Sequence, residues 1–335
     1  MDRNSWRIKM RKYTLSKFYL IPLLFFVSLF AYADSSFSKV YIFGDSLSDT
    51  GNLGSIVGGI PSPYVDNRIS NGPVAVDTLT AELGDTADAS LYLLGLNAGH
   101  NYSVAGAKAS TNEPIDLNTQ VLAFQANHAS IAPSDALYVI FIGGNDIRSA
   151  ARTADDVSAN SILQTANNNV KNAIALLNSI GAQHFLVINA PNIALLPESR
   201  LIAAAINNPA YLNRAEALSI KYNTILHNNL ENIEDENEDN IEITEFNLFK
   251  LFTKTIAKAG KLGITNTTEA CFMSSIQQFH PDCNFGSNAD QFYFFDEIHP
   301  TTGIHTLFGK AFVKAVKDDD DEKEDDDDKE NKNNH

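Results

Sequence analysis

Residues 136–146 read ALYVIFIGGND, an unbroken apolar run that ends in two glycines, an asparagine and an aspartate. A short run without polar residues predicts a β-strand that is buried on both faces, as at the centre of a parallel sheet. The paired glycines directly after the run predict a turn. We therefore expect a central strand over residues 136–142, with the side chain of Asn145 just beyond its carboxyl end.

Shorter runs of the same kind lie on both sides of this strand, and helical patterns separate them. The further expected strands are residues 39–43, 100–104, 184–189 and 241–246. The expected helices are residues 73–83, 154–180, 209–230, 249–259 and 303–316. Strands that alternate with helices predict an α/β fold with a mostly parallel sheet and helices on both faces. Active sites in such folds lie at the carboxyl ends of the strands.

The two ends of the 335-residue chain differ in composition from the rest. Residues 1–33 have a basic start, an apolar stretch and a final Ala-Tyr-Ala, which predicts a signal peptide cleaved after Ala33 and export to the periplasm or the exterior. A membrane anchor is the alternative, but a spanning helix needs roughly 20 apolar residues and this stretch is shorter.

Residues 318–335 are acidic and almost free of apolar side chains, so we expect a disordered tail. Residues 34–317 then form one domain, in which residues 231–240 are expected to be a solvated connection.

The chain carries a net charge of −16 at neutral pH. Nucleic-acid binding depends on basic patches, so this charge argues against it. Tight electrostatic docking on an anionic membrane is disfavoured for the same reason, although a transient contact with a membrane surface stays open. The sequence indicates no particular oligomeric state.

The chain has two cysteines, Cys271 and Cys283. In an oxidising compartment an even pair predicts one disulfide, which here would close a loop of about a dozen residues. Metal binding together with His280 is the alternative, but two cysteines and one histidine do not fill the four-ligand shell of zinc.

The strand expected at residues 39–43 is followed by Gly44, Asp45 and Ser46. A serine on a tight turn after a buried strand is presented above the sheet, where a nearby base can activate its hydroxyl as a nucleophile. In isolation, a serine that caps an ordinary helix explains the same residue. Asp49, a little further on, is a candidate to brace the turn through hydrogen bonds.

Asp296 and His299 lie just before the last expected helix. Three residues apart, they can meet across one turn, so that the carboxylate orients the imidazole toward the serine. A capping pair at the surface is the alternative. With Ser46 as nucleophile, these residues predict a Ser-His-Asp triad.

Two more positions can supply hydrogen-bond donors to the same site. Gly106 follows residues 100–104 in a turn of small residues, so its backbone N–H can be exposed. The side-chain amide of Asn145 can point into the same crevice, although a turn or helix cap is its alternative role. Together with the backbone N–H of Ser46, they predict an oxyanion hole with three donors.

These blocks resemble the GDSL family of lipases and esterases, also called SGNH hydrolases. The resemblance rests on four blocks in the family's order: FGDSLSDTGN at residues 43–52, NYSVAGA at 101–107, GGND at 143–146 and DEIHP at 296–300. Ala105 departs from the family, because many members have a second glycine there. The roles that the resemblance implies for the serine, glycine, asparagine, aspartate and histidine are those given above.

The resemblance implies a three-layer α/β/α, flavodoxin-like domain and acyl transfer through an acyl-enzyme, with no metal and no organic cofactor. The first block, the signal peptide and the small cysteine loop are similar to those of secreted bacterial phospholipases and lysophospholipases, and some relatives transfer acyl groups. We therefore expect a lipid carboxylic ester as substrate. Esters of carbohydrates or aryl alcohols are the alternative, and a non-catalytic lipid-binding surface protein is the alternative from another class. The aromatic residues between 279 and 295 are candidates either for an acyl pocket or for the core.

Overall fold

The computed structural model describes residues 37–236 and 240–333. The predicted signal peptide, residues 1–33, lies outside the described residues. Within the described part of the chain, we find no helix with the length and the apolar character needed to cross a membrane.

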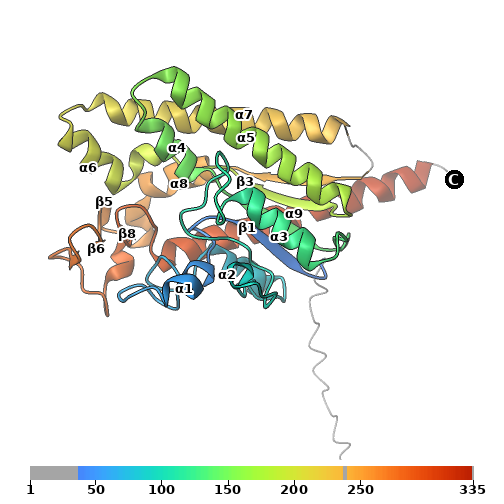
Figure 1. The fold of residues 1–335 in the computed structure, drawn as a ribbon, viewed down its shortest axis with the longest axis horizontal. Coiled ribbons are helices and arrows are strands. Elements are labelled where there is room, and N and C mark those ends of the chain that lie inside the picture. Colours follow the sequence, from blue (N-terminus) through green and yellow to red (C-terminus); the bar gives the residue numbers. More distant parts are fainter. Residues whose placement is uncertain (1–36, 237–239, 334–335) are drawn as a thin grey trace, which may run out of the picture. The chain divides into compact units, whose positions relative to one another are not determined.

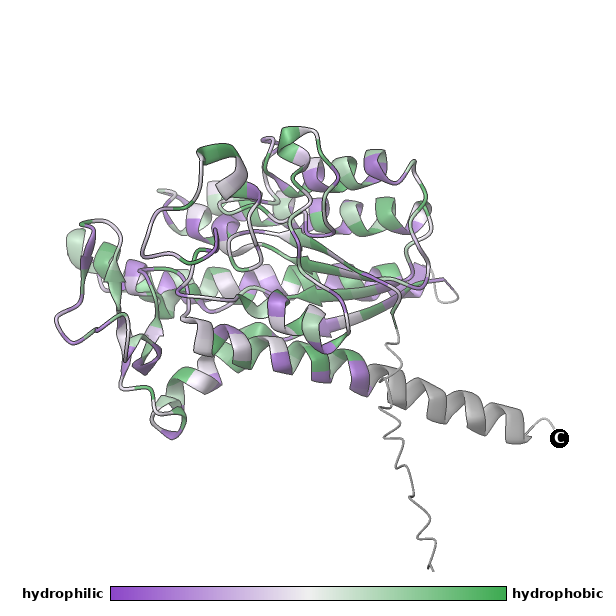
Figure 2. Ribbon diagram, turned by 90° about the horizontal axis from the view of Figure 1, so that it is seen from below, coloured by the Kyte–Doolittle hydropathy of each residue, from purple (hydrophilic) through white to green (hydrophobic). Residues whose placement is uncertain are grey.

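Four parallel strands form the main sheet, in the order β1-β2-β3-β4. Their bounds are β1 (Val40–Gly44), β2 (Leu137–Phe141), β3 (His184–Ile188) and β4 (Glu242–Phe246). Every residue of β1 and β2 is buried, as the apolar runs predicted, and the strands form a hydrophobic layer between the helices (Figure 2). Because the strands are parallel and in register, all their carboxyl ends lie at one edge of the sheet.

Residues 100–104, which we expected to form a strand, run along the outer side of β1 without regular pairing. The N–H of Ile42 donates to the carbonyl of His100, and the N–H of Tyr102 donates to the carbonyl of Ile42. The pairing is irregular because the N–H of Gly44, the next donor of β1 on this side, bonds to the side chain of Gln120 instead. Counted as a strand, the segment gives the order 2-1-3-4-5 of flavodoxin-like sheets.

Helices cover both faces of this sheet (Figure 1). Their bounds are α1 (Asn52–Val57), α2 (Ala75–Glu82), α3 (Leu117–Asn127), α4 (Gly144–Ala151), α5 (Asp156–Ser179), α6 (Pro197–Ala205), α7 (Ala210–Glu236), α8 (Leu248–Ala257) and α9 (Thr302–Asn333). On one face α4, α5 and α7 pack together, and on the other α2 packs along α9. The prediction of an α/β fold with helices on both sides of a parallel sheet is confirmed.

Two helices extend beyond the predicted bounds. We expected residues 231–240 to be a solvated connection, but α7 continues to Glu236, because Ile233 is buried one turn after Leu230 and extends the apolar stripe. We also expected a disordered tail from residue 318, whereas the backbone of α9 is helical to Asn333. A packed helix lengthens at little cost per residue, and no glycine or proline interrupts this stretch.

A smaller unit of short strands follows α8. β5 (Asn266–Ala270) pairs with β8 (Phe292–Phe294), and β6 (Phe272–Met273) pairs with β7 (Gln278–Phe279) as a hairpin. The predicted disulfide joins Cys271 to Cys283 across this hairpin, so both thiols are bonded and the metal alternative with His280 is wrong. All side chains from Phe292 to Phe295 are buried, which favours their role in the core.

Candidate active site

The serine of the first block lies where the order of the strands reverses. In open α/β sheets the crevice at such a point, beyond the carboxyl ends of the strands, is the usual ligand site. Ser46 follows β1 and Asn145 follows β2, so neighbouring strands bring both residues to this crevice. Gly44 permits the close approach of the two strand ends, since a Cβ there would lie 2.4 Å from the carbonyl oxygen of Phe141.

The turn that carries Ser46 is held by the buried carboxylate of Asp49. Its two oxygens accept hydrogen bonds from the backbone N–H groups of Gly51, Asn52, Leu53 and Ala105 at 2.8–3.1 Å. Two of these donors lie in the first block, Leu53 directly follows it, and Ala105 lies next to Gly106 in the second block. The expected bracing by Asp49 is therefore confirmed, and it also joins the two blocks.

Ser46, His299 and Asp296 lie within hydrogen-bonding distance in the predicted order. The Nε2 atom of His299 is 2.7 Å from Oγ of Ser46, and its Nδ1 atom is 2.8 Å from both carboxylate oxygens of Asp296. All three residues are buried. The arrangement allows His299 to accept the serine proton while Asp296 stabilises the imidazolium.

The pKa values of the two buried aspartates at this site are shifted in opposite directions. Burial opposes ionisation of Asp296, but the imidazole of His299 and the N–H groups of His299 and Ile298 outweigh it and hold the pKa below its ordinary value. At Asp45 burial prevails over a single backbone hydrogen bond from Leu47 and raises the pKa to about 6. Asp296 is thus the carboxylate that stays charged beside an imidazolium.

Tyr64 is a residue of this site that the sequence did not reveal. Its hydroxyl donates a hydrogen bond of 2.7 Å to Oδ2 of Asp296, across 232 residues of sequence. The ring packs edge-on against Phe272 and Phe295, beside the disulfide hairpin. No local pattern around Tyr64 signals this contact, because it depends on the folded position of a distant segment.

Glu297 fixes the segment between Asp296 and His299 to the same hairpin. Its carboxylate accepts hydrogen bonds from the backbone N–H and the hydroxyl of both Ser274 and Ser275, at 2.6–3.1 Å. Its backbone carbonyl accepts from the N–H of Glu198 at the start of α6. The segment is therefore held from two directions.

The three predicted oxyanion donors differ in the hydrogen bonds that they already make. Asn145 lines the same cavity as Ser46, and its amide is oriented by Arg148, whose Nη1 donates to Oδ1 at 2.6 Å. One hydrogen of Nδ2 is donated to the carbonyl of Ala107, which leaves the second for a ligand. Gly106, at φ 89°, is exposed in its turn. Among the described residues, neither its N–H nor that of Ser46 has an acceptor.

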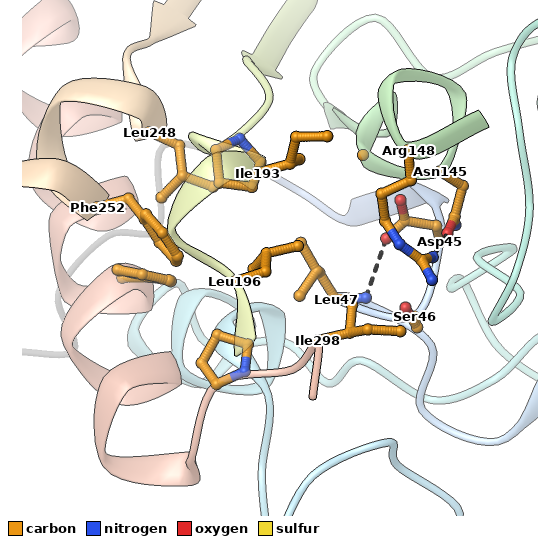
Figure 3. A pocket seen from close by; sticks show the side chains of 14 residues that line it. Asp45, Ser46, Leu47, Asn145, Arg148, Ile193, Leu196, Leu248, Phe252 and Ile298 are labelled. Carbon is orange, nitrogen blue, oxygen red and sulfur yellow. Dashed lines mark hydrogen bonds between the residues drawn. The ribbon is translucent and has the colours of Figure 1, made fainter. Parts of the chain in front are cut away.

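An apolar cavity opens beside Ser46 (Figure 3). It extends from Ser46 and Asn145 toward Leu248 and Phe252 on α8, with Ile193 and other aliphatic side chains in its walls. The aromatic residues between 279 and 295 are not among those that line it, so an acyl pocket built from them is not what the structure shows.

His305 is buried one turn into α9. Its Nδ1 atom accepts a hydrogen bond from the N–H of Ala75, which ties α9 to α2. Burial lowers its pKa to about 3, so the ring is neutral at physiological pH. These contacts fit a structural role.

Comparison with known proteins identifies the family. The family model of the GDSL-like lipase/acylhydrolases matches residues 40–312, which includes all four blocks. A phosphatidylcholine-sterol acyltransferase of Aeromonas hydrophila is 29% identical over 280 residues, covering 77% of this chain and 73% of that protein. Lipase 1 of Photorhabdus luminescens is 30% identical over 185 residues, covering 54% of this chain and 26% of that protein.

A solved structure of a lipolytic G-D-S-L family protein from Veillonella parvula is also similar, with a TM-score of 0.39 at 11% identity. It covers 84% of this chain and 96% of that one. The family assignment rests on the match to the family model, which spans most of the chain. The chain therefore belongs to the GDSL-like lipase/acylhydrolase family and is a carboxylic ester hydrolase.

Proposed function

We propose that this protein is an exported serine esterase that acts on carboxylic esters of lipids, with Ser46, His299 and Asp296 as its triad. The observation that carries the proposal is the position of His299, whose Nε2 lies 2.7 Å from the Ser46 hydroxyl while Nδ1 faces Asp296. A serine hydroxyl becomes an effective nucleophile when such a base removes its proton.

In the first step, Oγ of Ser46 attacks the ester carbonyl carbon and its proton passes to Nε2 of His299. The carbonyl oxygen becomes an oxyanion, and the donors proposed for it are the backbone N–H groups of Ser46 and Gly106 and the free Nδ2 hydrogen of Asn145. Each such donor contributes on the order of 3 kcal/mol to the transition state.

In the second step, the tetrahedral intermediate collapses and His299 gives its proton to the leaving alcohol. The acyl group remains on Ser46. Water then attacks the acyl-enzyme with His299 as base and releases the carboxylic acid, whereas an alcohol in place of water would give acyl transfer. These steps use only groups of the protein and its substrates.

The lipid nature of the substrate is supported by the cavity beside Ser46. Apart from Asp45, Ser46, Asn145 and Arg148, its walls are aliphatic and aromatic, which suits an acyl chain better than a sugar. The names of the two relatives, a phosphatidylcholine-sterol acyltransferase and a lipase, point in the same direction. Among lipids, we favour phospholipids and lysophospholipids.

Export is part of the proposal. The disulfide between Cys271 and Cys283 supports it, since such bonds form and persist in oxidising compartments. Residues 34–317 are proposed as the hydrolase domain. Mass spectrometry of the protein recovered outside the cytoplasm should show an N-terminus at Asp34, and an intact N-terminus at Met1 would contradict cleavage.

The test of the triad is the Ser46→Ala variant. Hydrolysis of short-chain nitrophenyl esters should fall by on the order of 10⁵-fold or more, and a fluorophosphonate probe should no longer label the protein. Ser179→Ala, an exposed serine on α5, is the matched control and should keep both properties. Undiminished hydrolysis by Ser46→Ala would refute the mechanism.

The substrate class needs a second measurement. Fatty acids released by the wild-type enzyme from phospholipids, lysophospholipids, acetylated sugars and aryl esters should be compared at matched concentrations. Preference for the first two supports the proposal, and preference for sugar or aryl esters contradicts the lipid assignment but leaves the triad intact.

A further inference from the structure

A second cavity, of about 500 Å³, lies beside the active site. It is bounded by α6 and by the short strands of the disulfide unit, which pack together at one end of the molecule (Figure 1). The polar side chains that line it are Arg200, Thr268, Glu269, His280 and Glu297. Pro197, Leu201 and Met273 add apolar surface.

Arg200 differs from the other arginines of the described residues. Arg68, Arg148, Arg152 and Arg214 each form an ion pair with a carboxylate. Arg200 forms none within the described part of the chain, and its Nε atom is buried without a hydrogen-bond partner, as is that of Arg214, whose guanidinium is nevertheless paired with Asp156. A buried donor without an acceptor is costly, and in so acidic a protein an unpaired guanidinium facing a cavity indicates a place for an anionic group.

The two carboxylates of the cavity differ in exposure and in the hydrogen bonds that they accept. Glu297 is occupied by its hydrogen bonds from Ser274 and Ser275. Glu269 is 59% exposed, and only its Oε2 atom is engaged, by Nδ2 of Asn266 at 2.9 Å and Nε2 of His280 at 3.3 Å. The cavity therefore presents one unpaired cation and one accessible anion. This combination suits a zwitterion better than a simple anion, which would be repelled by Glu269.

The cavity shares a wall with the cavity beside Ser46. Pro197 and Glu297 line the one, while their chain neighbours Leu196 and Ile298 line the other. The hydrogen bond from the N–H of Glu198 to the carbonyl of Glu297 joins the two halves of this wall at 2.8 Å. Since consecutive Cα atoms are about 3.8 Å apart, the two cavities are close neighbours.

We propose that this second cavity binds the zwitterionic phosphodiester headgroup of the lipid substrate, with the phosphate on Arg200 and the ammonium group on Glu269. The proposal rests on the function proposed above, because it places the headgroup beside the wall that borders the acyl cavity. The choline and ethanolamine phospholipids carry headgroups of this chemistry.

The test compares two soluble substrates of the full-length enzyme. One is a short-chain phosphatidylcholine below its micelle concentration, and the other is nitrophenyl butyrate, which has no headgroup. Arg200→Gln should lower kcat/KM for the phosphatidylcholine by at least tenfold, mainly through KM, and leave nitrophenyl butyrate unchanged. Glu269→Gln should have a smaller effect in the same direction. Arg214→Gln, which breaks a surface ion pair with Asp156, is the control.

The other outcomes separate the possibilities. Equal losses on both substrates in Arg200→Gln, also seen in Arg200→Lys, would show a structural role and overturn the proposal. Inhibition by inorganic phosphate as strong as by glycerophosphocholine, with no effect of Glu269→Gln, would show a simple anion site and overturn the zwitterion. If the wild type hydrolysed neither ester, yet bound glycerophosphocholine in a calorimeter in an Arg200-dependent manner, the proposed function would fail and the headgroup site would stand.

Discussion

Buried carboxylates hold both the serine side and the histidine side of the proposed triad, but side-chain hydroxyls contribute only on the histidine side. On the serine side, Asp49 collects backbone N–H groups from its own block and from the neighbouring turn. On the histidine side, the carboxylates of Asp296 and Glu297 also accept backbone N–H groups, but in addition they receive side-chain hydroxyls from Tyr64, Ser274 and Ser275. Backbone contacts shape the chain itself, whereas hydroxyl contacts orient a group on a chain already shaped. We therefore expect changes on the serine side to reduce stability and changes on the histidine side to reduce rate.

The largest effect is expected from Asp296→Asn. The amide cannot stabilise an imidazolium and favours the wrong tautomer of His299, so kcat should fall by on the order of 10⁴-fold. The free energy of unfolding should change far less, because the side chains have the same shape. Steady-state kinetics and denaturant titration measure the two quantities. Asp282→Asn on the disulfide hairpin, where the carboxylate is exposed, should match the wild type, and a kcat within tenfold in Asp296→Asn would remove Asp296 from the triad.

Asp49→Ala should have the next largest effect, and on stability. It leaves buried N–H groups without an acceptor, each worth about 1–3 kcal/mol, so the free energy of unfolding should fall by about 3 kcal/mol or more. Urea titration checks this, with the exposed Asp135→Ala as control at about 0.5 kcal/mol or less. A loss of activity without a loss of stability would break the contrast between the two sides.

The third prediction concerns pH and Asp45. Its pKa is raised to about 6 in the folded protein, above the value of an unfolded chain, so the folded state binds its proton more tightly. The neutral carboxyl therefore stabilises the fold below pH 4, and this contribution declines as the pH rises through 6, by on the order of 2–3 kcal/mol. The difference in unfolding free energy between the wild type and Asp45→Asn, measured from pH 4 to 7, should show this slope. A flat difference would contradict it.

Tyr64→Phe should have the smallest of these effects. It removes one hydrogen bond to a charged carboxylate but keeps the ring between Phe272 and Phe295, so kcat should fall about tenfold while KM and stability stay close to those of the wild type. Tyr92→Phe removes a comparable hydroxyl, bonded to the carbonyl of Pro114, and serves as control. A loss of stability without a loss of rate would make Tyr64 a packing residue rather than a positioning one.

The sequence predicted the parts of the molecule that depend on local patterns. The apolar run before Asn145 marked the central strand, and the helices predicted at 73–83, 154–180 and 249–259 end within two residues of the observed ones. Gly44 and the carboxylate of Asp49 belong to a block whose contacts are mostly within a few residues. Local periodicity and turn chemistry are enough to find such features.

The parts that sequence reasoning missed depend on distant contacts. Tyr64 reaches Asp296 only because the loop before α2 folds against the disulfide hairpin. Val157 is an apolar residue in the first turn of α5, yet it is 80% exposed, and the buried residues of this helix begin at Ala159. Neither position can be inferred from a period of 3.6 residues, because the outcome is decided by the neighbouring elements.

Residues 100–104 also close an otherwise open side of the sheet. A free edge strand presents unpaired N–H and C=O groups that recruit strands from other molecules. Here the N–H groups of Tyr102 and Val104 donate to β1 and occupy that edge. A change that released this segment would expose the edge of β1 to solvent. The first measurable effect would be self-association and turbidity of the protein solution rather than slower turnover.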